Sequence, residues 1–92
     1  MKELICEVCG KNKAVGIACV PMVSTSCAYC SGCLRANAHP WAVLIANSIC
    51  LGGLDQANES WKQMVIDTCA HLGRTLEQFN AEVAQGIKDL GG

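Results

Sequence analysis

The chain has little charge and few aromatic residues. Of its 92 residues, 16% are charged, 4% are aromatic and 51% are hydrophobic. The formal net charge is −1, and the sequence contains no run of lysine or arginine. Proteins that bind nucleic acid usually carry a basic patch that displaces counterions, so this composition argues against nucleic acid as a partner. The high apolar fraction favours a surface covered by another protein or by a second copy of the chain.

Long hydrophobic segments are also missing. The longest apolar run, residues 41–49, is interrupted by Asn47 and Ser48. It is far shorter than the ~20 residues that a helix needs to span a bilayer. The first six residues contain neither the apolar segment nor the cleavage site of a signal peptide. We therefore expect no membrane span and a cytoplasmic location, where cysteines bind metal or stay reduced instead of forming disulfides.

Cysteine, by contrast, is abundant, with eight residues. Two C-x2-C pairs stand out: Cys6 with Cys9, followed by Gly10, and Cys30 with Cys33 about twenty residues later. A two-residue spacer lets both thiolates of a tight turn face one ion, and two such pairs at this interval are typical of a tetrahedral zinc site. Gly10 provides the backbone freedom that such a turn needs. The sequence predicts that these four cysteines bind a structural Zn²⁺.

Cys27 offers an alternative ligand set. It extends the second pair to Cys27-x2-Cys30-x2-Cys33, so that Cys27 could replace Cys30 or Cys33. We favour Cys30 with Cys33, because helix-forming residues 34–38 follow and the amides at a helix start stabilise thiolates.

Iron is the alternative metal. The run of three cysteines copies the start of a bacterial ferredoxin motif, but Asn37 stands where the fourth cysteine would precede proline. A rubredoxin-like iron site would use the same four ligands, yet Leu34 follows the second pair in place of glycine. Zinc is therefore the favoured ion.

The other cysteines and both histidines receive structural interpretations. Cys19, Cys50 and Cys69 lie on apolar faces, where a free cysteine packs as a small hydrophobic residue. We expect His39 to cap or pack at a helix start, and His71 to be a structural or surface residue in the last turn of a helix, where its charge suits the dipole. Four cysteine ligands leave a zinc ion no open position, and no nucleophile with a base is evident. We therefore predict no catalytic residues and no enzymatic activity.

The N-terminal third predicts a β-hairpin between the two halves of the metal site. Residues 14–20 and 23–29 have the composition of strands, and Pro21 is expected to end the first. A short helix over residues 33–38 follows. Such a hairpin is marginal alone, so we expect the metal to stabilise it.

Residues 39–92 predict a helical lobe. Pro40 suits the first position of an apolar helix over residues 41–51, which we expect to be buried on most sides. Asn58 is a suitable N-cap for a second helix, and Thr75 starts a capping box for the last one. We expect these last two helices to form an antiparallel pair over the apolar helix, with Trp41 and Trp61 in the core. Their apolar stripes are Trp61, Met64, Val65, Thr68, Cys69 and Leu72 in one, and Leu76, Phe79, Val83, Ile87 and Leu90 in the other.

The cysteine pattern also resembles known modules. A C-x2-C-G knuckle, a hairpin-length interval and an aromatic-C-x2-C-L sequence at a helix start resemble a treble-clef or zinc-ribbon module over the first third of the chain. The whole chain, with Tyr-Cys-Ser-Gly-Cys-Leu at positions 29–34, resembles small proteins of unassigned function encoded by bacteriophages. The latter resemblance implies a phage accessory protein in the host cytoplasm.

Together these features predict one α+β domain, mostly α, over residues 1–92. It has a zinc knuckle, hairpin and short helix in residues 1–38 and a helical lobe in residues 39–92, three to four helices in all. We expect a non-enzymatic, zinc-stabilised protein–protein interaction module that acts on a host factor if the phage resemblance holds. The alternative is a nucleic-acid-binding or transcription-modulating zinc ribbon. A homodimer is a further expectation, because Ile66 lies off the apolar stripe of its helix and needs cover.

Overall fold

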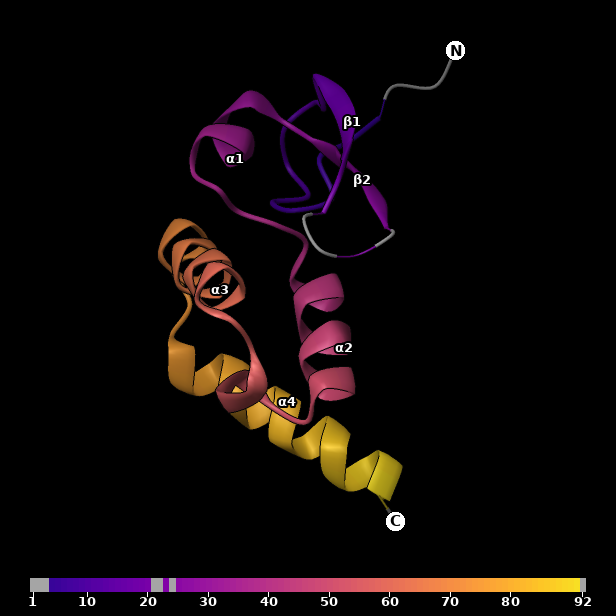
Figure 1. Cartoon of the computed structure of the whole chain (residues 1–92). Helices are drawn as coiled ribbons and strands as arrows, with labels where there is room; N and C mark the ends of the chain where they lie inside the picture. The colour runs from indigo at the N-terminus through magenta and orange to yellow at the C-terminus, as the bar shows by residue number, and fades with distance from the viewer. Residues whose placement is uncertain (1–3, 21–22, 24, 92) are drawn as a thin grey trace.

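The computed structural model describes residues 4–20, 23 and 25–91, in which a small two-stranded sheet lies next to a group of helices (Figure 1). The predicted α+β class, with helix predominating, is confirmed. None of the helices in this part of the chain is long and apolar enough to cross a membrane. The elements are the strands β1 (Gly16–Cys19) and β2 (Ser26–Tyr29), the helices α1 (Ser31–Arg35), α2 (Trp41–Leu51), α3 (Glu59–Leu72) and α4 (Leu76–Gly91), and the 3-10 turn η1 (Leu54–Gln56).

The predicted hairpin is confirmed, although both strands are shorter than expected. β1 and β2 pair antiparallel in a register that runs from Gly16 opposite Tyr29 to Cys19 opposite Ser26. Pro21, which was expected to end the first strand, lies outside the described residues. β1 is exposed along its whole length, whereas the last three residues of β2 are buried. β2 is therefore the strand that packs against the rest of the protein.

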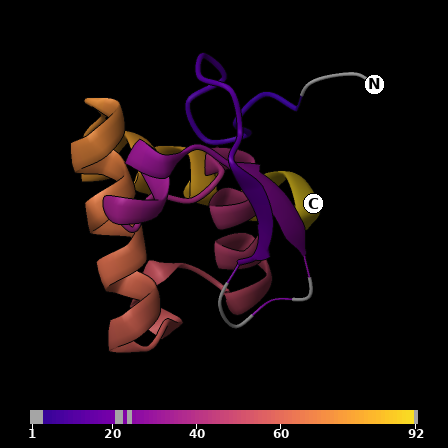
Figure 2. The same ribbon diagram turned by 90° about the horizontal axis from the view of Figure 1, so that it is seen from above.

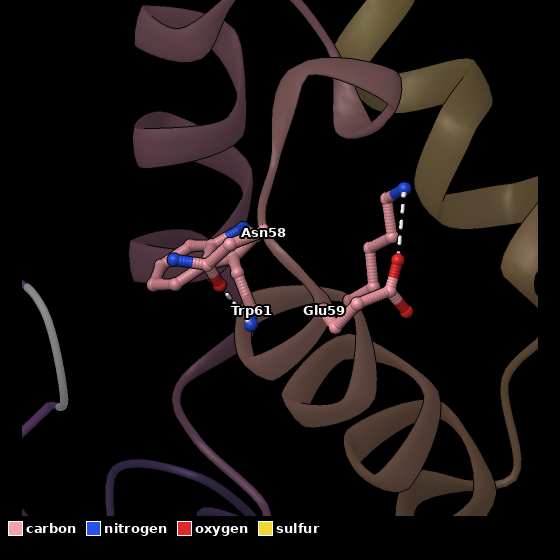
Figure 3. A network of polar contacts seen from close by, with 4 residues as sticks. Asn58, Glu59 and Trp61 are labelled. Atoms are coloured by element: carbon pink, nitrogen blue, oxygen red, sulfur yellow. Dashed lines mark hydrogen bonds and ion pairs between the residues drawn. The ribbon is translucent and has the colours of Figure 1, made fainter.

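Local sequence signals set the start and end of α3 and the start of α4 as predicted, whereas the short helix expected over residues 33–38 begins and ends earlier, as α1 (Ser31–Arg35). Asn58 caps α3, its Oδ1 accepting a 2.8 Å hydrogen bond from the backbone N–H of Trp61 (Figure 3). At the start of α4, Thr75 and Gln78 exchange the two hydrogen bonds of a capping box, 2.9 and 3.1 Å long. Gly73 ends α3 in the left-handed conformation, with φ 69°. These signals act within a few residues, so tertiary packing does not alter them.

Helix α2 differs from its prediction in two respects. Pro40 is the residue before the helix and not its first residue. Only Leu44 and Ser48 are fully buried, so the expected burial on most sides is wrong. The physical reason is that one face carries small side chains, which expose little apolar area to water. The residues of this face are Ala42, Ala46 and Cys50, and Leu51, the last residue of the helix, is also exposed.

The arrangement of α3 and α4 is also different from the prediction. Figure 1 looks almost along α3 and shows α4 from the side, and the turned view in Figure 2 shows α3 from the side. The two helices therefore cross steeply, and the expected antiparallel pair is wrong. Instead α4 packs across α2, where the rings of Trp41 and Phe79 meet edge to face with centroids 5.2 Å apart. A Cβ atom at Gly86 would collide with Ile49, so the glycine permits this close approach.

Both tryptophans have partners within the chain. Trp61 is buried, and its Nε1–H donates to the hydroxyl of Ser48 at 3.0 Å. Trp41 is half-buried, its Nε1–H donates to Glu82 at 3.0 Å, and the guanidinium of Arg74 lies 4.5 Å from its ring centroid. The predicted packing role is confirmed for Trp61, and Trp41 packs at the edge of the core.

Candidate metal centre

Four cysteine sulfurs converge where the first loop meets the start of α1. The sulfurs of Cys6, Cys9, Cys30 and Cys33 all lie within 4.8 Å of one another, and the pair from Cys9 and Cys30 is 3.9 Å apart. With Zn–S bonds of about 2.3 Å, tetrahedral geometry places two ligand sulfurs about 3.8 Å apart. The structure thus brings together the four cysteines that the spacing indicates, in an arrangement that fits one metal ion.

The first pair lies on a tight turn. The backbone N–H of Gly10 donates to the carbonyl of Cys6, and the N–H of Cys6 donates to the carbonyl of Asn12, both at 2.9 Å. Gly10 has a φ of 68°, a conformation that favours glycine. This turn directs both side chains of the knuckle toward the second pair.

The second pair lies at the start of α1. Cys30 is the residue before the helix, and its carbonyl accepts a 3.1 Å hydrogen bond from the N–H of Leu34. Cys33 lies within the helix and has 0% exposure. Because β2 ends directly before Cys30, the sheet register and the first helical turn together position these two sulfurs.

Backbone amides favour the thiolate form of two of the four cysteines. The N–H of Cys33 donates to the sulfur of Cys30 and lowers its pKa to about 6, and the side chain of Asn12 also donates to this sulfur, at 3.8 Å. The backbone N–H groups of Asn12 and Lys11 lower the pKa of Cys9. Both thiols therefore lose their proton more readily than an ordinary cysteine, which suits anionic metal ligands.

Cys33 has the opposite tendency. Burial raises the pKa of its thiol, and the neighbouring sulfurs of Cys30, Cys6 and Cys9 raise it further. Four thiolates at these distances repel one another strongly unless a cation lies among them. The chemistry of the donor set therefore fits a soft divalent ion such as zinc, which deprotonates coordinating thiols.

Cys27 lies outside this group of four. It is buried on β2 opposite Ala18, and burial, followed by the nearby carboxylate of Glu7, raises the pKa of its thiol. Of the three cysteines in the C-x2-C-x2-C run, the structure thus places Cys30 and Cys33 with the first pair.

His71 is the residue near the centre that sequence reasoning missed. Its Nε2 lies 3.3 Å from the sulfur of Cys33, although 38 residues separate them in the sequence. The sequence predicts a structural or surface residue at this position, and His71 is exposed. No spacing rule relates a histidine in the last turn of α3 to a cysteine in α1, so the sequence contains no signal for this contact.

His39 packs at the start of α2, as expected. Its Nδ1 lies 2.7 Å from the Tyr29 hydroxyl, and its backbone N–H donates to the Thr68 hydroxyl at 3.0 Å. Burial lowers the pKa of His39 and raises that of Tyr29 to about 12, so both are neutral near pH 7. The phenol then donates to Nδ1, and the Nε2–H faces the side-chain oxygen of Asn37 at 3.3 Å.

The three remaining cysteines divide differently from the prediction. Cys69 is buried in the core, as expected, and burial raises the pKa of its thiol. Cys19 and Cys50 are exposed, so their expected packing on apolar faces is wrong. The reason is that β1 and the outer face of α2, on which they lie, face solvent.

Comparison with models of protein families, with characterised proteins and with solved structures finds no match to this chain. The resemblances to treble-clef modules and to phage proteins therefore stay predictions.

Proposed function

We propose that the chain is a non-enzymatic, zinc-stabilised protein–protein interaction module. The observation that carries this proposal is the convergence of Cys6, Cys9, Cys30 and Cys33, whose sulfurs lie within 4.8 Å of one another. Four protein thiolates complete the tetrahedral coordination of zinc and leave no position for a substrate or a reactive water. This donor set supports a structural role for the metal and not a catalytic one.

The surroundings of the site support the structural role. The two strands have four residues each, and a two-stranded hairpin of this size is at most marginally stable in water. The ligands come from the first loop and from the segment directly after β2, so an ion held by all four joins both ends of the hairpin region. Structural zinc contributes about 10–16 kcal/mol of apparent binding energy in finger peptides, which is ample to fold such a unit.

The surface of the hairpin supports the interaction role. Val15, directly before β1, and Ile17, within β1, lie two residues apart and are 67% and 63% exposed. Leu4 and Ile5, in the neighbouring segment, are about half exposed; the carbonyl of Leu4 accepts a hydrogen bond from Ala14. We name Leu4, Ile5, Val15 and Ile17 the hairpin patch. Large exposed apolar side chains on neighbouring segments support a surface that binds another protein.

If the resemblance to phage proteins holds, the partner is a host protein in the host cytoplasm. The test is affinity capture from host lysate with the zinc-loaded wild type and with two variants, one with two substitutions and one with a single substitution. We expect V15S/I17S, which removes half of the hairpin patch, to lose the captured protein. L90S is the matched control, because Leu90 is 78% exposed and lies at the far end of α4. Equal capture by all three chains would contradict the proposed surface.

One further outcome of the capture experiment and one separate measurement test the alternatives. Capture of nucleic acid, with binding that falls steeply as salt rises, would favour the alternative of a nucleic-acid-binding zinc ribbon. Light scattering on the purified chain tests whether a second copy covers the patch. In that case we expect the mass of a dimer for the wild type and of a monomer for V15S/I17S.

A further inference from the structure

Helix α3 contacts the segment that carries the second cysteine pair through three polar side chains. Asp67, Thr68 and His71 are spaced at i, i+1 and i+4, so they lie close together on one side of the helix. We name them the α3 seam. Each pairs with a residue between β2 and α2, which joins the metal centre to the helical lobe. The pairs are Asn37 with Asp67 at 2.9 Å, the backbone N–H of His39 with Thr68 at 3.0 Å, and Cys33 with His71 at 3.3 Å.

The third of these contacts reaches a proposed metal ligand. Cys33 has 0% exposure, so water cannot donate hydrogen bonds to its sulfur. Cys9 and Cys30 receive donors from backbone amides and from Asn12. Among the described residues outside the four-cysteine group, the ring of His71 is the donor that lies within hydrogen-bonding distance of the Cys33 sulfur.

The position of His71 distinguishes it from the four cysteines. Its nitrogen approaches Cys33 but does not belong to the group of donor atoms that lie within 4.8 Å of one another. It therefore acts on a ligand and not on the ion. When Cys33 coordinates a metal as a thiolate it has no proton of its own to donate, so a hydrogen bond across this 3.3 Å contact requires the proton on Nε2 of His71.

We propose that His71 is a positioning residue of the metal centre, whose Nε2–H donates to the Cys33 thiolate and thereby ties that ligand to α3. The inference rests on the proposed metal site and extends it to the helical lobe. A hydrogen bond to a coordinated sulfur fixes its orientation and offsets part of its charge, and partners of this kind contribute about 10–100-fold to metal affinity. Since the bond forms only when α3 lies against α1, metal binding also stabilises the docking of the lobe.

The test compares His71→Leu with His71→Gln in the full chain. Leucine has a similar size and no donor, whereas the glutamine amide places an N–H near the position of Nε2. We expect H71L to weaken zinc affinity at least about tenfold in competition with a chelator, and H71Q to retain most of it. In the cobalt-loaded chain, the thiolate-to-cobalt charge-transfer band of H71L should move to longer wavelength, because a sulfur without its hydrogen bond releases charge more readily.

Asp67→Ala is the matched control, because it breaks the contact with Asn37 in the same seam without touching a sulfur. We expect its zinc affinity and cobalt spectrum to equal those of the wild type. The inference is overturned if H71L and H71Q behave alike, or if D67A loses as much affinity as H71L, which would indicate a general loss of docking. A wild-type chain that binds neither zinc nor cobalt refutes the proposed function itself. A wild type with a four-thiolate cobalt spectrum that H71L leaves unchanged refutes only the role of His71.

Discussion

Thr68→Val isolates one contact between the helical lobe and the segment after the second cysteine pair. The Thr68 hydroxyl is fully buried, donates to the carbonyl of Met64 at 2.7 Å and accepts from the backbone N–H of His39 at 3.0 Å. Valine has nearly the same shape, so the substitution creates no cavity. It leaves the buried N–H of His39 without its acceptor.

An unsatisfied buried donor costs about 1–3 kcal/mol. The carbonyl of Met64 loses only a second hydrogen bond, because carbonyls inside a helix also accept from the helix backbone. We therefore expect T68V to lower the free energy of unfolding by about 2 kcal/mol. In a domain of this size each kcal/mol lowers the midpoint of thermal unfolding by about 4–8 °C. Thermal unfolding of the zinc-loaded protein, followed by circular dichroism at 222 nm, measures the change.

Thr68→Ser is the matched control. It keeps the hydroxyl and removes one methyl group, for which we expect a loss of about 1 kcal/mol. A T68V variant within about 0.5 kcal/mol of the wild type, or less destabilised than T68S, would show that the hydrogen bond to His39 contributes nothing and would refute the reasoning.

Two further predictions follow from the cysteines and from His39. Cys30→Ser should lose bound metal and stability, whereas Cys27→Ser should keep the metal. Elemental analysis of both proteins checks this. Loss of metal from Cys27→Ser, with metal retained by Cys33→Ser, would move the site by three residues. Because burial lowers the pKa of His39, the unfolded chain binds a proton there more readily, so stability should fall as pH drops below about 6.5, the ordinary pKa of histidine. The measurement is the unfolding free energy of wild type and of His39→Gln from about pH 8 to about pH 5. The cysteines contribute equally to both proteins, so their effect cancels in the difference. A difference that does not change with pH would contradict this prediction.

The parts of the structure that the sequence predicts are those set by neighbouring residues. Asn58 and the pair Thr75 and Gln78 bond to backbone groups within three residues, so their roles as caps do not depend on the rest of the fold. The two C-x2-C pairs are similar, because each turn orients its own sulfurs and the hairpin between them brings the turns together. The spacing, together with the helix-forming residues 34–38 that favour Cys30 and Cys33 over Cys27, therefore predicts the grouping of the four cysteines.

The errors concern contacts between distant elements. The apolar stripes of α3 and α4 are compatible with several crossing angles, and α4 packs across α2, where Gly86 permits a close approach to Ile49. Periodicity likewise does not distinguish an exposed strand from a covered one, which is why the exposure of Cys19 was missed. The contact between His71 and Cys33 depends on how α3 lies against α1, and this geometry exists only after the helices pack.

The central claim is that the chain holds one zinc ion through four cysteines. Elemental analysis of the folded wild-type protein, purified without added metal, tests it directly, with Cys50→Ser as a control that removes an exposed cysteine outside the cluster. We expect about one zinc per chain in both proteins and none in Cys6→Ser. A folded wild-type protein without bound metal, or one that contains iron in place of zinc, would contradict it.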